Sequence, residues 1–187
     1  MTSTSQRSQL IRRCSSVHPA TATPGQGEVH AMIVVIDNIG DAVRDAGGWL
    51  CDRVWAGWDV TAWVPAGRDT TALQILGVTT MALDDESDDL WPGRRPTAVA
   101  IGSDMSWLPH RIRAKIDALM RHPRTEVTVW GDRRSAPGDR FQDLPHRLSA
   151  AAIAFKTQAM HAASLPGTCG SAEALRSYAP RLAVGLQ

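Results

Sequence analysis

Three acidic residues each follow an apolar segment that reads as a buried strand, either directly or within three residues: Asp37, Asp104 and Asp132. Ligands of parallel sheets bind outside the carboxyl ends of the strands, so the three carboxylates would lie along one edge. Carboxylates gathered there could hold Mg²⁺, which prefers oxygen ligands. The alternative is that these residues turn the chain and cap the helices that follow the strands.

Two neighbouring residues extend this candidate site. Asn38 follows Asp37, and Arg133 follows Asp132, where its guanidinium could offer positive charge to a phosphate. The sequence therefore nominates five ligand-binding residues: Asp37, Asn38, Asp104, Asp132 and Arg133. Under the metal interpretation, Asp37, Asp104 and Asp132 are the ligands of Mg²⁺; no other cofactor is implied.

The elements that must position these residues alternate between strand and helix. The apolar segments lack a two-residue alternation, which is typical of strands covered on both faces in a parallel sheet. Strands are expected over 32–37, 58–64, 78–83, 97–101 and 126–130. Helices are expected over 41–56, 108–120, 144–164 and 171–178, and a further short helix is expected to end at residue 76. This order predicts a single three-layer, Rossmann-like α/β domain with a mostly parallel sheet of about five strands.

The chain divides into three parts. Residues 1–28 have no helical or strand period and are expected to be a disordered tail. Residues 29–164 form the predicted α/β domain, and residues 165–187 a short helix and a tail. Because Met32 stands at the start of the first strand, we hypothesise that translation begins there.

Familiar catalytic motifs are missing from the sequence. The loop after the first strand reads Asp37-Asn-Ile-Gly-Asp41 rather than G-x-G-x-x-G, and neither a P-loop nor a G-x-S-x-G elbow occurs. Three cysteines without a CxxC pair and six histidines without HExxH support no zinc site.

Asp37 after the first strand, and Gly102-Ser-Asp104 after a later one, resemble PIN and NYN-type nucleases. That resemblance implies acids at a sheet edge around Mg²⁺ or Mn²⁺. The chain departs from the pattern where Asn38 follows Asp37 without a spacer. It departs again where Ser106 and Trp107 stand in place of a second acid.

Composition restricts the partners. A formal net charge of +1 argues against nucleic acid as a ligand, and no apolar run reaches the ~20 residues needed to span a bilayer. The cysteine usage favours the cytoplasm, and the preference for arginine over lysine is typical of a G+C-rich bacterial genome. The alanine-rich helix over 144–164 could dock a protein partner or form a homodimer.

These observations predict a cytoplasmic ligand-binding or regulatory module on a Rossmann-like scaffold without a complete catalytic set. The alternative is a Mg²⁺-dependent phosphoryl-transfer or nuclease enzyme that uses the carboxylates at the sheet edge. A third interpretation, a nucleotide binder without catalysis, is not separated from the first by the sequence.

Overall fold

The computed structural model describes residues 30–83, 95–102, 106–122, 124–131 and 141–178. Its strands and helices alternate along the chain, except that no helix is described between the third and fourth strands or between the fifth and sixth. The predicted tail over 1–28 lies outside the described residues, as do three of the nominated site residues: Asp104, Asp132 and Arg133.

A seven-stranded sheet in the order β3-β2-β1-β4-β5-β7-β6 forms the centre of the molecule. The strands are β1 (Ala31–Val35), β2 (Asp59–Pro65), β3 (Thr79–Leu83), β4 (Ala98–Gly102), β5 (Glu126–Trp130), β6 (Phe141–Arg147) and β7 (Ala172–Tyr178). The first five pair in parallel, whereas β7 is antiparallel to both β5 and β6. The mostly parallel α/β sheet is thus confirmed, with seven strands rather than about five.

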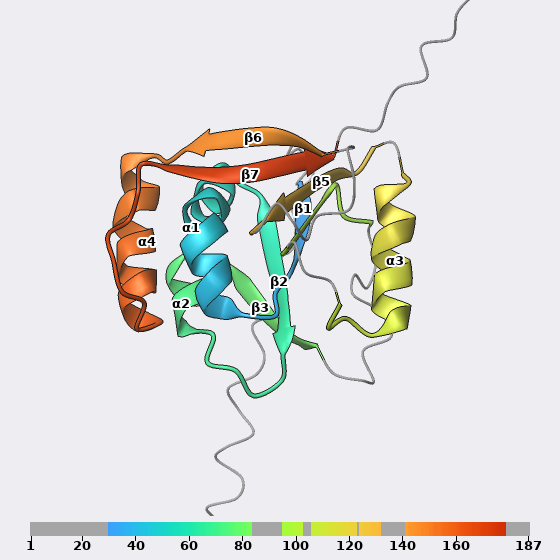
Figure 1. Ribbon diagram of the computed structural model, residues 1–187, viewed down its shortest axis with the longest axis horizontal. Helices are drawn as coiled ribbons and strands as arrows, with labels where there is room; N and C mark the ends of the chain where they lie inside the picture. The colour runs from blue at the N-terminus through green and yellow to red at the C-terminus, as the bar shows by residue number, and fades with distance from the viewer. Residues whose placement is uncertain (1–29, 84–94, 103–105, 123, 132–140, 179–187) are drawn as a thin grey trace, which may run out of the picture.

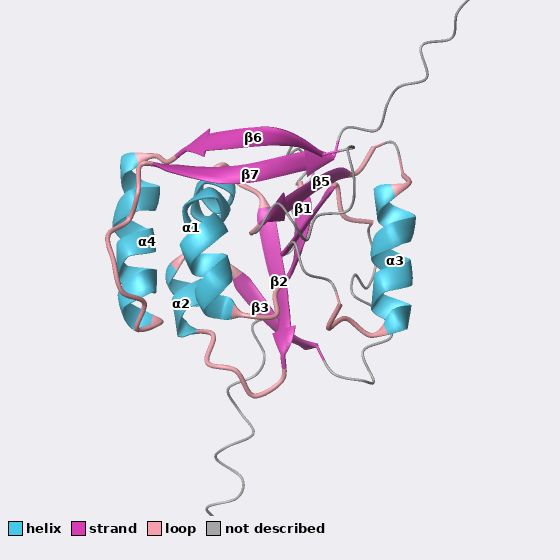
Figure 2. Cartoon of the chain, viewed as in Figure 1, coloured by secondary structure: helices cyan, strands magenta, loops and turns pink. Residues whose placement is uncertain are grey.

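The helices lie on both faces of the sheet (Figures 1 and 2). They are α1 (Ile39–Trp55), α2 (Thr71–Ile75), α3 (His110–Met120) and α4 (Ala150–Ala162). Helices α1, α2 and α4 contribute to one core cluster and α3 to the other. Right-handed crossovers place α1 and α3 on opposite faces because the chain moves from β1 towards β2 but from β4 towards β5, in opposite directions along the sheet.

Strand β1 shows why its sequence is apolar throughout. Met32 and Val34, followed by Ile36 just after the strand, belong to the cluster beneath α1, while Ile33 and Val35 belong to the cluster beneath α3. Both sets are buried, which is the condition expected for a central parallel strand.

The helix predicted over 171–178 is wrong, because residues 172–178 form β7. Ala-Glu-Ala-Leu-Arg consists largely of good helix formers, but pairing with β5 and β6 overrides that local preference. The buried positions, Glu173 and Leu175, are two residues apart, as a strand requires. The sheet therefore extends beyond residue 164, where the predicted domain ended.

The helix predicted over 144–164 begins six residues later. Residues 144–147 belong to β6, and Pro145 lies within that edge strand, where a missing N–H is tolerated. Ser149 caps α4: its Oγ accepts a hydrogen bond from the N–H of Ala152 at 3.0 Å. Ala152 and Ala159 are buried against elements of the same chain, and the homodimer through this helix stays a prediction.

A buried ion pair joins α4, β7 and the middle of α1. Lys156 Nζ lies 2.6 Å from Glu173 Oε1, and the two side chains are 5% and 2% exposed. The N–H groups of Gly48 and Trp49 donate to the two Glu173 oxygens at 2.8 Å each, while Lys156 donates to the Arg44 carbonyl at 2.6 Å. Arg44 C=O and Gly48 N–H would pair with each other in a regular α-helix, so the ion pair is inserted into the hydrogen-bond ladder of α1.

Among the described helices, none is long and apolar enough to cross a membrane.

Candidate functional site

The first wall of the site is the turn from β1 into α1. The N–H of Ile36 still donates to the Trp63 carbonyl of β2 at 2.9 Å, and the chain then leaves the sheet at Asp37, which is exposed. Asn38 is the N-cap of α1, and its Oδ1 accepts from the N–H of Asp41 at 3.2 Å. Asn38 therefore has the capping role that was the alternative to ligand binding.

The second wall is the loop from β2 into α2. Arg68 and Asp69 are both exposed there. Asp69 Oδ1 accepts from the hydroxyl of Thr71 at 2.7 Å and from its N–H at 2.9 Å. These hydrogen bonds, that of the hydroxyl first, lower the pKa of Asp69, so its carboxylate remains charged to lower pH than usual.

The third wall is the carboxyl end of α4, where the chain turns at Ser164. Its φ of +54° places it in the left-handed region, the only described residue other than glycine with a positive φ. Gly40 of α1 lies close to this wall: a Cβ on Gly40 would stand 3.2 Å from the side chain of Leu165.

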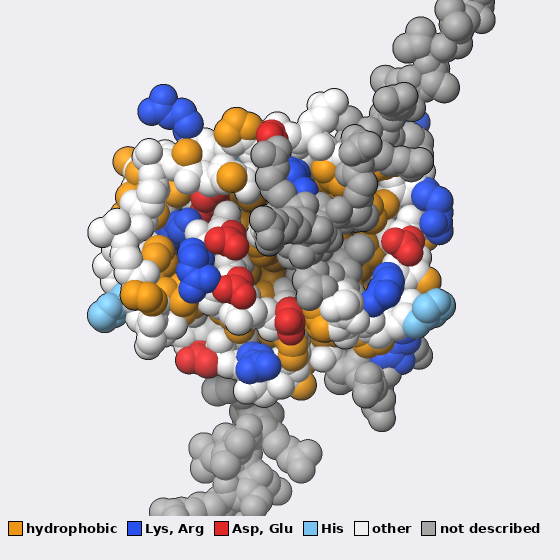
Figure 3. All heavy atoms as spheres, in the orientation of Figure 1, with side chains coloured by type: hydrophobic (Ala, Val, Ile, Leu, Met, Phe, Trp, Pro, Cys, Tyr) orange, Lys and Arg blue, Asp and Glu red, His pale blue; other side chains and the backbone are white. Residues whose placement is uncertain are grey.

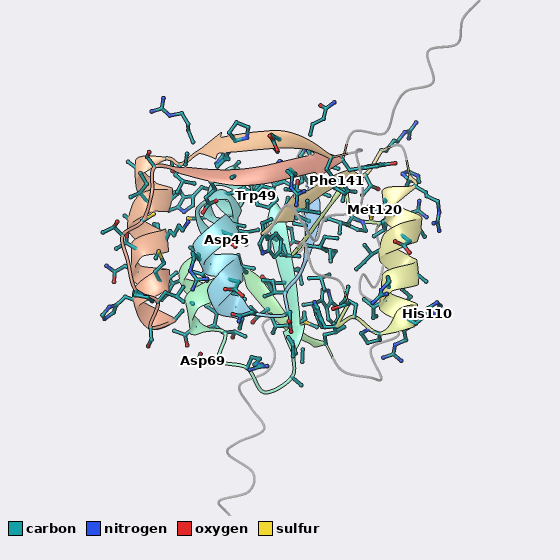
Figure 4. The ribbon with its side chains drawn as sticks, viewed as in Figure 1. Asp45, Trp49, Asp69, His110, Met120 and Phe141 are labelled. Carbon is teal, nitrogen blue, oxygen red and sulfur yellow. The ribbon has the colours of Figure 1, made fainter. Side chains whose placement is uncertain are left out.

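Together the three walls enclose a cavity of about 380 Å³. It is lined by Asp37, Asn38, Ile39, Gly40, Arg68, Asp69, Ala72, Ala162, Ala163 and Ser164. Figure 4 shows Asp69 at the end of the molecule to which β2 runs, far from Trp49. The cavity thus occupies the carboxyl side of the parallel strands, where α/β sheets bind ligands.

The cavity brings charges of both signs together. Asp37 and Asp69 supply carboxylates, and Arg68 supplies a guanidinium. Within the part of the chain that the structure describes, neither Asp37 nor Arg68 is engaged in an ion pair. On the face shown in Figure 3, acidic and basic side chains of the described residues are interspersed. The site therefore offers a proton acceptor and an oxyanion-binding cation to a polar ligand.

The predicted site residues have different outcomes. Asp37 and Asn38 lie at the cavity, whereas Asp104, Asp132 and Arg133 lie outside the described residues, so their convergence with Asp37 stays a prediction. Among the described residues, no group of three or more His, Cys, Asp or Glu side chains could hold a metal ion. The Mg²⁺ site thus depends on Asp104 and Asp132.

Three polar or charged side chains of the cavity were not among the residues nominated from the sequence: Arg68, Asp69 and Ser164. Arg68 and Asp69 follow the buried strand β2, and the same reasoning that selected Asp37 at the end of β1 would have selected them. Ser164 carries no such signal, because its place at the cavity depends on how α4 packs against α1 and α2.

Comparison with known proteins identifies the fold. No protein-family model and no curated protein sequence matches the chain. The A40926 pseudoaglycone deacetylase superposes with a TM-score of 0.55 at 14% identity, covering 83% of this chain and 99% of that one. The zinc-inhibited form of teicoplanin deacetylase gives 0.51 at 14%, covering 79% and 97%. The 4-carboxy-2-hydroxymuconate hydratase of Pseudomonas putida gives 0.50 at 14%, covering 85% and 100%.

These likenesses overturn the predicted function. The proteins that share the fold are named as deacetylases and a hydratase, which are enzymes that use water. The prediction of a binding or regulatory module is therefore wrong, and so is the phosphoryl-transfer or nuclease alternative. The lack of a familiar catalytic motif does not make a scaffold non-catalytic.

Proposed function

We propose that the protein is a hydrolase that removes an acetyl group from an amine of a polar substrate. One observation carries this proposal: a cavity with carboxylates and a guanidinium lies at the carboxyl side of β1 and β2, in a fold shared with two deacetylases.

Asp37 is the proposed general base. Its carboxylate is exposed to the cavity and takes a proton from a water molecule, which attacks the carbonyl carbon of the acetyl group. The resulting oxyanion is stabilised by the Arg68 guanidinium. When the carbon–nitrogen bond breaks, Asp37 returns its proton to the leaving nitrogen, and acetate and the free amine are the products.

The charges of the cavity suit both products. A free amine is protonated near neutral pH, and the carboxylates of Asp37 and Asp69 attract a cation. Acetate is an anion, for which Arg68 is the matching group. This pairing favours an amide over an ester as the substrate, because an ester would release a neutral alcohol.

A cation remains a separate proposal. Asp37 is a suitable oxygen ligand for Mg²⁺, but the described residues do not complete a metal site, and the steps above use none. Titration of Mg²⁺ with thermal unfolding as the readout tests this proposal. Stabilisation of the wild type that is lost in Asp37→Asn supports the metal, and no stabilisation contradicts it.

Acetate release tests the function. The wild type should release acetate from at least one member of a panel of acetylated amines that includes acetylated A40926 pseudoaglycone and teicoplanin. Asp37→Asn should lower kcat at least ~100-fold, the usual contribution of a general base. Asp59→Asn is the matched control: it removes the same charge from an exposed residue at the opposite end of β2 and should leave kcat unchanged.

Two results would contradict the proposal. The first is a wild type that releases no acetate from any member of the panel. The second is an Asp37→Asn variant as active as the wild type. A product that has gained one water molecule without losing acetate would assign hydration instead.

A further inference from the structure

Three helices of this protein end in the same hydrogen-bonded turn. In each, the residue after the C-cap takes a positive φ, and two N–H groups bond back to the last turn of the helix in the pattern of a Schellman motif. The bonds are Gly57 N to Val54 O and Trp58 N to Arg53 O in α1, Gly77 N to Gln74 O and Val78 N to Leu73 O in α2, and Ser164 N to His161 O and Leu165 N to Met160 O in α4.

The residue in the left-handed position differs among the three. Helices α1 and α2 use glycine, with φ of +86° at Gly57 and +80° at Gly77, whereas α4 uses serine, with φ of +54° at Ser164. A Cβ in this conformation crowds the following carbonyl, so any residue other than glycine costs free energy there. Among these three turns, only the one that lines the cavity has a side chain in this position.

Packing does not account for the serine. Ser164 is exposed, and its hydroxyl has no hydrogen bond among the described residues. What distinguishes its turn from the other two is the cavity, which it shares with Asp37 and Arg68. Strain that is retained at a ligand site, where a glycine would relieve it, is expected when the side chain itself contacts the ligand.

We propose that Ser164 is a specificity-determining residue whose hydroxyl hydrogen-bonds a polar group of the substrate in the cavity. This assignment rests on the proposed function. Walls on α1 and on the β2–α2 loop supply the charged groups, and Ser164 adds a neutral group that both donates and accepts. The proposal therefore specifies a substrate with a hydroxyl or amide group beside the acetylated nitrogen, within reach of the end of α4.

The test compares Ser164→Gly with Ser164→Ala. Both variants remove the hydroxyl, but only glycine relieves the backbone. Ser164→Gly should raise Tm by about 2–4 °C, and Ser164→Ala should not raise it. Both should lower kcat/KM for acetate release about three- to tenfold, mainly through KM, as expected for one lost hydrogen bond.

Gly57→Ser is the matched control. It places a serine in the same turn at the end of α1, where a Cβ meets nothing within 4 Å and which does not line the cavity of Asp37 and Arg68. Its Tm should fall by about 2–4 °C with acetate release unchanged. An active wild type with unchanged kcat/KM in both Ser164 variants overturns the role of Ser164 alone. A wild type that releases no acetate overturns the proposed function and this assignment with it.

Discussion

Two regions of this protein contain the same kinds of charged residue in opposite surroundings. Where α1, α4 and β7 meet, Lys156 and Glu173 are buried, and backbone groups of α1 complete their hydrogen bonds. At the carboxyl side of β1 and β2, Asp37 and Arg68 are exposed in a cavity, with no ion pair among the described residues.

The difference separates structural from chemical roles. A buried charge that loses its partner leaves the other charge without solvent, so the first region should control stability. Exposed charges remain hydrated and contribute little to stability, but they are free to meet a ligand. The free energy of unfolding of single variants should therefore distinguish the two regions.

Glu173→Gln should produce the largest loss of stability. It keeps the shape of the side chain but leaves the Lys156 ammonium buried beside a neutral amide, which should cost about 3–5 kcal/mol. Denaturant unfolding measures this loss. The double variant Glu173→Gln with Lys156→Met also removes the unpaired charge, and it should recover part of the lost stability. A loss below ~1 kcal/mol in Glu173→Gln alone would contradict a structural role for the ion pair.

Asn38→Ala should have an intermediate effect, although Asn38 lies at the cavity. Its side chain caps α1, and loss of such a cap costs about 1 kcal/mol. Asn38→Ser, which preserves a capping oxygen, is the control and should unfold at nearly the wild-type denaturant concentration. Equal losses in the two variants would show that the amide does more than cap the helix.

Two aspartates of α1, Asp45 and Asp52, should affect the pH dependence of the free energy of unfolding in opposite directions. Burial acts to raise the pKa of Asp52, but hydrogen bonds from Ser149 and His146 outweigh it and lower that pKa. Burial raises the pKa of Asp45. Asp52 thus contributes stability above its unfolded pKa, and this contribution is lost as the pH falls through its folded pKa. Ionised Asp45 lowers stability, and this cost is removed in acid, where the carboxyl group is protonated.

Single variants separate these two contributions. Near neutral pH, Asp52→Asn should lower the free energy of unfolding and Asp45→Asn should raise it. In acid, where both carboxylates are protonated, each variant should approach the wild type. Unfolding at several pH values measures both, and two changes of the same sign would refute the opposition.

Asp37→Asn should have the smallest effect on stability, within ~0.5 kcal/mol of the wild type. The reason is that Asp37 is exposed and is not part of a packed or hydrogen-bonded network among the described residues. Chemical unfolding of the purified variant measures this value. A destabilisation as large as that of Glu173→Gln would mean that the two regions do not differ in role.

The sequence predicts the parallel part of the fold well because its signals are local. The apolar runs of β1 and β4 and the one-sided pattern of α1 follow from burial on two faces or on one. Strand β7 was missed because Ala-Glu-Ala-Leu-Arg favours a helix, and only pairing with β5 and β6 makes it a strand. Of the site, Asp37 was predictable from its place after a strand, whereas Ser164 was not, because its position depends on tertiary packing.

The ion pair in α1 also has a consequence for the order in which the protein is assembled. Gly48 and Glu173 are 125 positions apart in the chain, yet Glu173 completes a step in the middle of the first helix. During synthesis, residues 39–55 leave the ribosome long before β7 exists, so Arg44 C=O and Gly48 N–H must first pair with each other or with water. The first helix therefore reaches its final form only when the last described strand has joined the sheet, and formation of this contact should be a late event in folding.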